Sequence, residues 1–360
     1  MADGPERLFY DALPRLEVDG REDTLANALL QQLEMSEAEG GLASLELRFT
    51  NTGEVAGRGH EMPFESGAHE GLGLGARLRL VAGDTHDPQE LFRGIVTGLE
   101  LVAQGSHPPQ LVVLAEDALQ TARLRRRSRV FADVTLDDLV ARIAQDHGLR
   151  VVSAGLDQAV GTEVQLNETD LGFLRRMCAR FDVDLQIVGD ELHVAPCHAV
   201  DRGALSLDFG DRLVAVRALA DLADQVSAVT LSGWDPAAAR SFEVESSATA
   251  LGPGAGRTGA MVLAAVLDPR REHGGPVSVA SRAEAQAIVD ATHRRRARRF
   301  VTVEGTATGD PRLRVGSEVV IGGIGPRFAN TYYVTHTQHR FDRTSGYLTE
   351  FRAACAFFGG

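Results

Sequence analysis

The 360-residue sequence predicts a mainly β protein with an α/β insert, in which an internal duplication supplies two similar β modules. Three observations support this fold class. Strand-like blocks recur in the same order about 240 residues later, the hydrophobic period changes from strand to helix between the two sets, and it then returns to strand. The matching blocks are residues 74–80 and 315–321, 95–98 and 333–336, and 111–116 and 348–353.

Strands dominate the first part of the chain after one early helix. Apolar residues at helical spacing predict that helix over residues 24–35. Residues 42–49 alternate, with Leu45, Leu47 and Phe49 on one face, which predicts a half-buried strand. Further strands are expected at residues 76–81, 91–102 and 110–115, and a loop at residues 51–73.

The segment 125–198 reads as a compact α/β insert. Thr135 is a suitable N-cap for a helix, and Gly148 suits the position just beyond the C-terminal end of that helix. A second helix is expected over residues 170–180, and a hairpin that turns at Gly189 follows it.

The last part of the chain returns to strands. Val229 and Leu231 belong to a predicted strand, and Ser281 opens a capping box whose helix runs to about Ala297. The strands of the second module are expected from Phe300 onwards. The predicted domains are a first β domain at 1–120, an α/β insert at 121–199 and a second β domain at 200–360.

Composition restricts the partners and the place of synthesis. The net charge is −13 at pH 7, which disfavours nucleic acid as the main partner because duplex binding requires neutralised phosphates. Residues 1–7 lack the basic start and apolar core of a signal peptide, and no apolar run approaches the ~18 residues of a membrane span. We therefore expect synthesis and folding in the cytoplasm.

The cysteines and histidines do not suggest a metal site. Cys178, Cys197 and Cys355 include no C-x-x-C pair, so we expect three reduced thiols and no structural zinc. His336 and His339 are three residues apart in a strand, which places them on opposite faces and unsuited to joint ligation.

Two glycine-containing stretches fall short of catalytic motifs. Residues 252–258 resemble a phosphate-binding loop, but Arg257 replaces the lysine and Leu251 replaces the first glycine, so we expect a mobile loop. Residues 232–235 (SGWD) do not form the G-x-S-x-G elbow of a hydrolase. No carboxylate pair can be assigned as a glycosidase dyad from sequence. We expect no catalytic, cofactor-binding or metal-binding residues and no cofactor.

Two basic runs, residues 123–129 and 293–299, allow three interpretations. They can contact nucleic acid, form a solvated linker and a charged helix C-terminus, or dock an acidic neighbouring subunit.

Four motifs in order resemble the late-control D protein family, the baseplate hub of contractile phage tails. The same fold forms the N-terminal part of the valine-glycine repeat spike proteins of type VI secretion. The motifs are residues 92–99 (FRGIVTGL), 170–176 (DLGFLRR), 229–235 with their Gly-Trp-Asp, and the closing hairpin that includes 333–339 and 346–351 (GYLTEF).

The resemblance implies a structural role without catalysis. Three copies would form a ring, each giving two β-barrel tube domains, so that a pseudo-six-fold surface joins a hexameric inner tube to a trimeric spike. The insert would decorate the outside, and other baseplate proteins would be further partners. The particle would be a phage tail or a related injection machine. A glycan hydrolase of a tail complex and a nucleic-acid-binding module are the alternatives.

Two further expectations accompany this resemblance. The chain ends at residues 357–360, directly after the second module, so we expect a separate spike protein. Gly94 lies in the first motif, and we expect Gly94→Val to weaken ring assembly because strand glycines often mark a close backbone approach.

Overall fold

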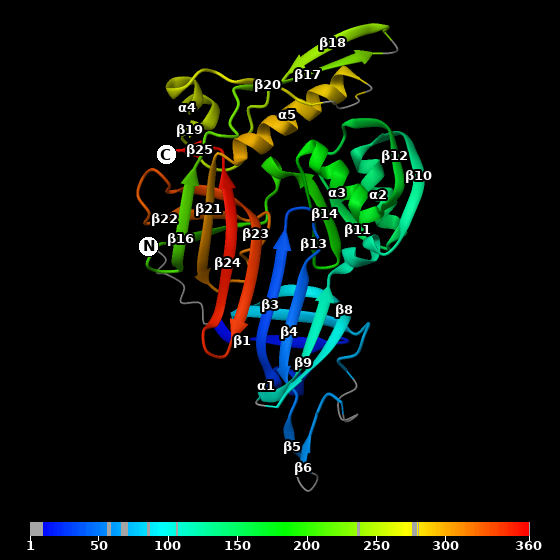
Figure 1. Cartoon of the computed structure of the whole chain (residues 1–360), viewed down its shortest axis with the longest axis vertical. Coiled ribbons are helices and arrows are strands. Elements are labelled where there is room, and N and C mark those ends of the chain that lie inside the picture. The colour runs from blue at the N-terminus through cyan, green and yellow to red at the C-terminus, as the bar shows by residue number, and fades with distance from the viewer. Residues whose placement is uncertain are drawn as a thin grey trace.

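The structure, a computed structural model, describes residues 10–359 except 56–58, 66–70, 85, 86, 106, 236, 237, 276–278 and 280. Within this part of the chain the protein is mainly β, as predicted, and a sheet of 13 strands dominates it (Figure 1). All pairings in that sheet are antiparallel except one, between β15 and β22. The expectations for residues 1–7 and for the last residue, Gly360, lie outside the described residues.

The first half of the sheet begins near the N-terminus and includes a short helix, α1 (Thr24–Leu29). A hairpin of β5 (Gly53–Val55) and β6 (Gly59–Glu61) extends from its lower end in Figure 1. The strands of this half are β1 (Tyr10–Val18), β2 (Arg21–Glu22), β3 (Leu30–Ala38), β4 (Ser44–Thr50), β7 (Arg77–Asp84), β8 (Pro88–Gln104) and β9 (His107–Glu116).

The helix predicted over residues 24–35 is wrong in its second part. The helix ends at Leu29, and β3 begins at Leu30. This strand lies between β4 and β23 and pairs with both, so hydrogen bonds on its two edges hold it extended. Tertiary pairing of this kind overrides local helix propensity. The prediction for residues 42–49 is confirmed, because β4 buries its alternate residues Leu45, Leu47 and Phe49.

The second half of the sheet uses strands from the last part of the chain. They are β15 (Ala204–Asp208), β16 (Leu213–Ala220), β21 (Val301–Thr308), β22 (Glu318–Gly322), β23 (Asn330–Asp342) and β24 (Gly346–Cys355). The first half pairs in the order β3-β4-β9-β8-β7-β1, and the second half in the order β16-β21-β24-β23-β22-β15. When the two-residue strand β2, which pairs only with β1, is left aside and the strands are numbered within each half, these orders are the same. One difference is that β1 runs antiparallel to β7, whereas β15 runs parallel to β22.

The insert packs around its own hydrophobic core at the side of the sheet (Figure 1). Thr135 is the N-cap of α2, as predicted, and it belongs to a capping box, since Thr135 Oγ1 accepts from the Asp138 amide and the Asp138 carboxylate accepts from the Thr135 amide. The elements are two 3-10 turns, Ala118–Arg123 and Cys197–Ala199, with β10 (Arg126–Thr135), α2 (Leu136–Asp146), β11 (Arg150–Ser153), β12 (Ala159–Thr169), α3 (Asp170–Phe181), β13 (Val183–Val188) and β14 (Glu191–Pro196).

A further unit, which we call the arm, lies at the top of Figure 1. It consists of a three-stranded sheet of β17, β18 and β20 covered by α5, whose N-cap is Ser281 as predicted. Val229 and Leu231 pack against Ala285 and Val289 in its core. The elements of this region are β17 (Ala228–Asp235), β18 (Arg240–Glu245), β19 (Arg257–Thr258), α4 (Gly259–Val266), β20 (Arg271–His273), α5 (Arg282–Arg298) and β25 (Phe357–Phe358).

Among the helices of the described residues, none combines the length and the apolar character needed to cross a membrane.

Gly94 should tolerate no side chain. A Cβ at this position would lie 2.2 Å from the Glu116 carbonyl oxygen and 2.6 Å from Cζ of Phe92. We expect Gly94→Val to lower the melting temperature by several degrees, because the β8–β9 ladder must shift to admit the side chain. Gly105→Ala in the same hairpin meets nothing within 4 Å and serves as the control in thermal unfolding. Equal melting temperatures for the two variants would contradict the prediction.

Candidate functional site at the junction of the sheet halves

The two halves of the large sheet meet where β3 pairs with β23 (Figure 1). Residues 32–38 pair antiparallel with residues 336–342, although Glu37 and Thr337 are 300 residues apart in the sequence. Each strand also pairs within its own half, so the backbone ladder continues across the boundary. We call this strand pair, with the side chains buried along it, the junction.

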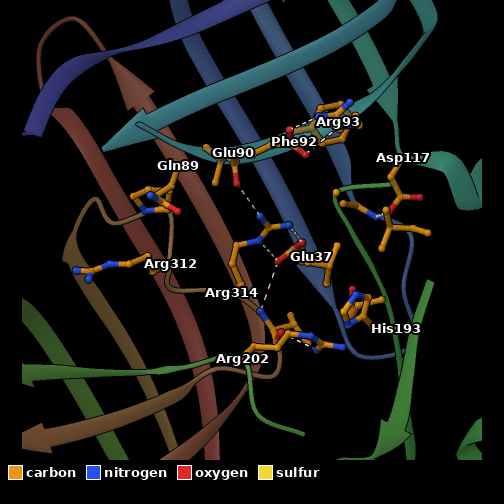
Figure 2. A pocket seen from close by; sticks show the side chains of 18 of the residues that line it. Glu37, Gln89, Glu90, Phe92, Arg93, Asp117, His193, Arg202, Arg312 and Arg314 are labelled. Atoms are coloured by element: carbon orange, nitrogen blue, oxygen red, sulfur yellow. Dashed lines mark hydrogen bonds and ion pairs between the residues drawn. The ribbon is translucent and has the colours of Figure 1, made fainter. Parts of the chain in front are cut away.

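A buried ion pair lies at the centre of the junction (Figure 2). Glu37 on β3 is 4% exposed, and Arg314 binds both of its carboxylate oxygens, with Nε at 2.6 Å from Oε2. Thr337 Oγ1 donates to the same carboxylate at 3.4 Å. Burial alone would raise the pKa of Glu37, but the charge and hydrogen bonds of Arg314 outweigh it and hold that pKa below its ordinary value. The carboxylate is therefore ionised and fully engaged.

His339 forms a second buried polar group in the junction. Its Nε2 lies 3.0 Å from the Leu313 carbonyl oxygen, which can only accept, so this nitrogen carries the proton. Its Nδ1 then accepts from the Tyr347 hydroxyl at 2.8 Å, and Thr349 Oγ1 is 3.1 Å away. Burial lowers the pKa of His339 to about 3. The ring is neutral at ordinary pH.

A second set of buried charges, which we call the insert seam, fixes the insert to both sheet halves. Arg298 at the end of α5 donates to Glu39 beyond β3 at 2.8 Å and to Asp182 of the insert at 3.1 Å. Its guanidinium lies 5.1 Å from the centroid of the Tyr333 ring. Burial raises the pKa of Glu39 above its ordinary value, although the Arg298 charge opposes this effect. Three segments distant in sequence thus share one cation.

A pocket of about 610 Å³ opens beside the junction (Figure 2). Its wall includes four carboxylates, and each already has a partner. Those partners are Arg314 for Glu37, Arg79 and Arg93 for Glu90, the amides of Ala43 and Leu119 for Asp117, and the amide of Gly203 for Asp201. Burial raises the pKa of Asp117 to about 6. These carboxylates hold the chain together and do not form a free acid–base pair.

The interpretation of the first basic run as a solvated linker is wrong, because its residues from Arg126 onwards form β10. Arg127 and Arg129 both bind Asp146 Oδ2, at 2.8 and 2.5 Å. Arg129 also binds Asp170 at 2.6 Å. Much of the positive charge of this run is therefore neutralised within the insert.

The second run lies at the C-terminal end of α5, as predicted. Arg296 binds Glu272 with two hydrogen bonds of 2.7 and 2.6 Å, and Arg295 donates to the Ala179 carbonyl at 2.5 Å. Arg298 belongs to the insert seam. These three arginines support internal contacts, which leaves a weaker basic surface than the sequence suggests.

The glycine-rich loop at residues 252–258 is held in place by hydrogen bonds, which differs from the mobile loop that the sequence predicts. The Asn330 side chain bonds both the amide and the carbonyl of Ala255, at 3.0 and 2.8 Å. Arg257 then pairs with Phe358 between β19 and β25. Gly254 has φ +103° and sits against Cys355, so the glycine permits close packing here.

The histidines, the cysteines and the SGWD segment do not form a catalytic or metal-binding arrangement within the described residues. His336 and His339 alternate along β23, the first half-buried and the second buried, and no trio of His, Cys, Asp or Glu in the described ranges is arranged to hold a metal. The three cysteines are free, as predicted, and all three are buried. Residues 232–235 lie along β17 and not at a strand-to-helix turn.

Sequence reasoning missed the Glu37–Arg314 pair. One signal was present: Leu33, Met35 and Glu37 alternate, so a charge follows two apolar residues on one face of a strand. A charge at such a position implies a buried partner. Reading residues 24–35 as a helix concealed this alternation.

Removing the Glu37 charge should destabilise the protein strongly. Glu37→Gln leaves the Arg314 charge without its counterion, and we expect a loss of about 3 kcal/mol in the free energy of unfolding. Glu34→Gln is the matched control on the same strand, since its pair with Arg340 is exposed and should cost less than about 1 kcal/mol. Chemical denaturation measures both values, and equal losses would contradict a special role for the buried pair.

His339 should make stability depend on pH. Between its ordinary pKa of 6.5 and its folded pKa of about 3, the unfolded chain binds a proton that the folded chain does not. The free energy of unfolding should therefore fall on acidification below pH 6.5, by up to about 1.4 kcal/mol per pH unit more in the wild type than in His339→Gln. His273→Gln, at an exposed position on β20, is the control. Parallel pH profiles for wild type and His339→Gln would refute this assignment.

Solved structures with this fold include tail proteins. The 43 kDa tail protein of prophage MuSo2 from Shewanella oneidensis aligns with a TM-score of 0.67 and 13% identity, over 94% of this chain and 97% of that chain. The tail protein from Neisseria meningitidis MC58 aligns with a TM-score of 0.66 and 14% identity, over 95% and 96%.

The Escherichia coli c3393 protein aligns with a TM-score of 0.61 and 12% identity, over 94% of this chain and 76% of that chain. It is a component of the type VI secretion system with structural similarity to the bacteriophage T4 tail proteins gp27 and gp5. The resemblance to tail hub proteins is thus confirmed at the level of the shared fold, over nearly the whole chain.

No curated protein matches the sequence. The model of one protein family, described as the Alg8 N-terminal domain, matches residues 55–342, which is more than half of the chain. The chain belongs to the Alg8 N-terminal domain family.

Proposed function

We propose that this protein is the structural hub of a contractile injection machine. Three copies form a ring of pseudo-six-fold symmetry that joins a hexameric inner tube to a trimeric spike. The observation that carries this proposal is the shared pairing order of the two sheet halves, because three chains would then present six near-equivalent β modules. The tail-protein fold supports the same role.

Irregularities that repeat in both halves support an origin by duplication. The β8–β9 ladder shifts register after Val96, and the β23–β24 ladder shifts after Val334. The β3–β4 ladder shifts after Leu30, and the β16–β21 ladder after Leu213. Bulges are retained features of a fold. Two register shifts at corresponding places in both halves therefore favour a common origin over coincidence.

One tight turn also repeats, with the same hydrogen bond. The amide of Gly75 donates to the Val96 carbonyl at 2.9 Å, and the amide of Gly316 donates to the Val334 carbonyl at 3.0 Å. The two glycines have φ of +85° and +84°, a left-handed conformation that favours glycine. The first turn directly precedes β7 and the second directly precedes β22, and these two strands occupy corresponding positions in the two halves.

The proposed organisation keeps the three predicted domains, with tube domains at 1–120 and 200–360 and the insert at 121–199. Each tube domain would curl into a barrel around its own core, and two hydrophobic clusters support this division, the first of which also takes in Phe341 and Tyr347 of the second half. A third cluster holds the insert together and also includes Ile288 of α5. The insert would then decorate the outside of the ring.

The role we propose is not enzymatic. The carboxylates beside the junction are bound by arginines or backbone amides, which weakens the alternative of a glycan hydrolase. The internal pairing of the basic runs weakens the nucleic-acid alternative. The proposed partners are the inner tube protein, the spike and other baseplate proteins, and the proposed location is the cytoplasm on synthesis and then a tail-like particle.

The hub proposal predicts a closed three-chain species. Native mass spectrometry or mass photometry, with and without the inner tube protein of the same genome, should detect a particle of three times the 38.6 kDa chain mass. A protein that stays monomeric at every concentration, and that binds neither tube nor spike, would exclude the role.

A further inference from the structure

Two strand edges in the described structure are open at matching positions. The strand β23 pairs with β24 along one edge, and along the other edge with β22 and then with β3. In the first half, β8 pairs with β9 along one edge. Along its other edge, β8 pairs with β7 only as far as Ile95, and residues 98–104 pair there with no described strand. In the second half, β16 pairs only with β21, which leaves the other edge of residues 215–220 open.

We infer that residues 99–104 of β8 pair antiparallel with residues 215–220 of β16 in a second copy of this chain. The pairing would repeat, between chains, the contact that β23 and β3 make within one chain. This inference rests on the proposed hub function and adds to it the strands, the register and the chemistry of the subunit contact.

The register follows from the ladders. Val96 lies opposite Ala115, which lies opposite Leu45, which lies opposite Met35. In the second half the same path runs from Val334 through Ala353 and Val303 to Ala218. Met35 and Ala218 therefore occupy corresponding positions at the two strand edges.

The partner of each β8 residue can then be named. His339, five residues after Val334, lies opposite Met35 at the junction, and Thr337 lies opposite Glu37. The corresponding β8 residues are Leu101, five after Val96, and Leu99. Between two copies, Leu101 would thus lie opposite Ala218, and Leu99 opposite Ala220.

The side chains suit an apolar contact between chains. Leu99 and Leu101 are 41% and 49% exposed, although they share a face with the buried residues Val113 and Leu111 directly across β9. Large apolar side chains exposed on the core side of an open strand indicate a surface that another chain covers. The alanines of β16 would cover them without steric conflict.

The two contacts differ in chemistry at four corresponding positions. At the junction, Thr337 and His339 are buried and polar, whereas their counterparts are leucines. Glu37 corresponds to Ala220, and Arg314, two residues before Gly316, corresponds to Gly73, two residues before Gly75. The permanent contact within the chain is ion-paired, and the contact between chains is apolar.

The geometry favours closure into a ring. Each copy offers one β8 edge and one β16 edge, so the contact is head-to-tail and leaves open edges unless the chain of copies closes. Closure at three copies would remove all of these edges, which would otherwise template aggregation.

Paired cysteines test the register. Directly opposed residues have Cα atoms about 4.5–5.5 Å apart, within the range of a disulfide. Leu99→Cys with Ala220→Cys should give covalent dimers and trimers on non-reducing gels after mild oxidation. Leu99→Cys with Val216→Cys, about 14 Å out of register at 3.4 Å per residue, is the control and should give at least tenfold less. The buried native cysteines are the same in both variants.

A charge at the edge tests the apolar contact. Leu101→Lys should weaken trimer formation at least tenfold in mass photometry while the melting temperature of the monomer stays unchanged. Leu166→Lys, at a 75% exposed position on the insert, is the matched control and should leave the trimers intact.

The outcomes separate this inference from the hub proposal. Trimers that form normally in Leu101→Lys, or that cross-link equally in both cysteine pairs, would overturn the strand pairing and leave the hub function standing. A wild-type chain that never forms trimers, even with tube protein, would overturn both.

Discussion

The backbone pairing of β3 with β23 is the interaction on which the rest of the structure depends. It makes one sheet of two halves that lie at opposite ends of the chain. It also sets the position of Glu37, whose carboxylate can be buried only because the same pairing brings Arg314 to it. Without that ladder the buried carboxylate of Glu37 would lose its cation, and an unpaired buried charge is costly.

Buried charges recur wherever segments distant in sequence meet. The Glu37–Arg314 pair lies between the sheet halves, and Arg298 lies between the insert and both halves. Buried ion pairs add little net stability compared with apolar packing of the same volume, but a displaced partner is strongly unfavourable. Such pairs therefore suit a scaffold that must hold its parts in one relative orientation.

Local elements could be predicted from the sequence, whereas contacts between distant segments could not. The insert helices follow from their caps and apolar faces, and β4 follows from its alternation. The second part of the helix predicted over 24–35 failed because β3 is held by two neighbouring strands that local sequence does not reveal. Glu37 and Arg314, 277 residues apart, form a site that periodicity cannot connect. The anchored glycine-rich loop depends on Asn330, which is 75 residues away from Ala255 in the sequence.

The helix α5 connects two regions that otherwise have separate cores. In its N-terminal half, Ala285 and Val289 pack against the three-stranded sheet of the arm. At its C-terminal end, Arg298 donates hydrogen bonds to Glu39 and Asp182. Because one continuous helix makes both sets of contacts, the arm cannot shift along α5 without disturbing the contacts at the base of the insert and at the end of β3. The helix α5 therefore couples the position of the arm to that of the insert and to the end of β3.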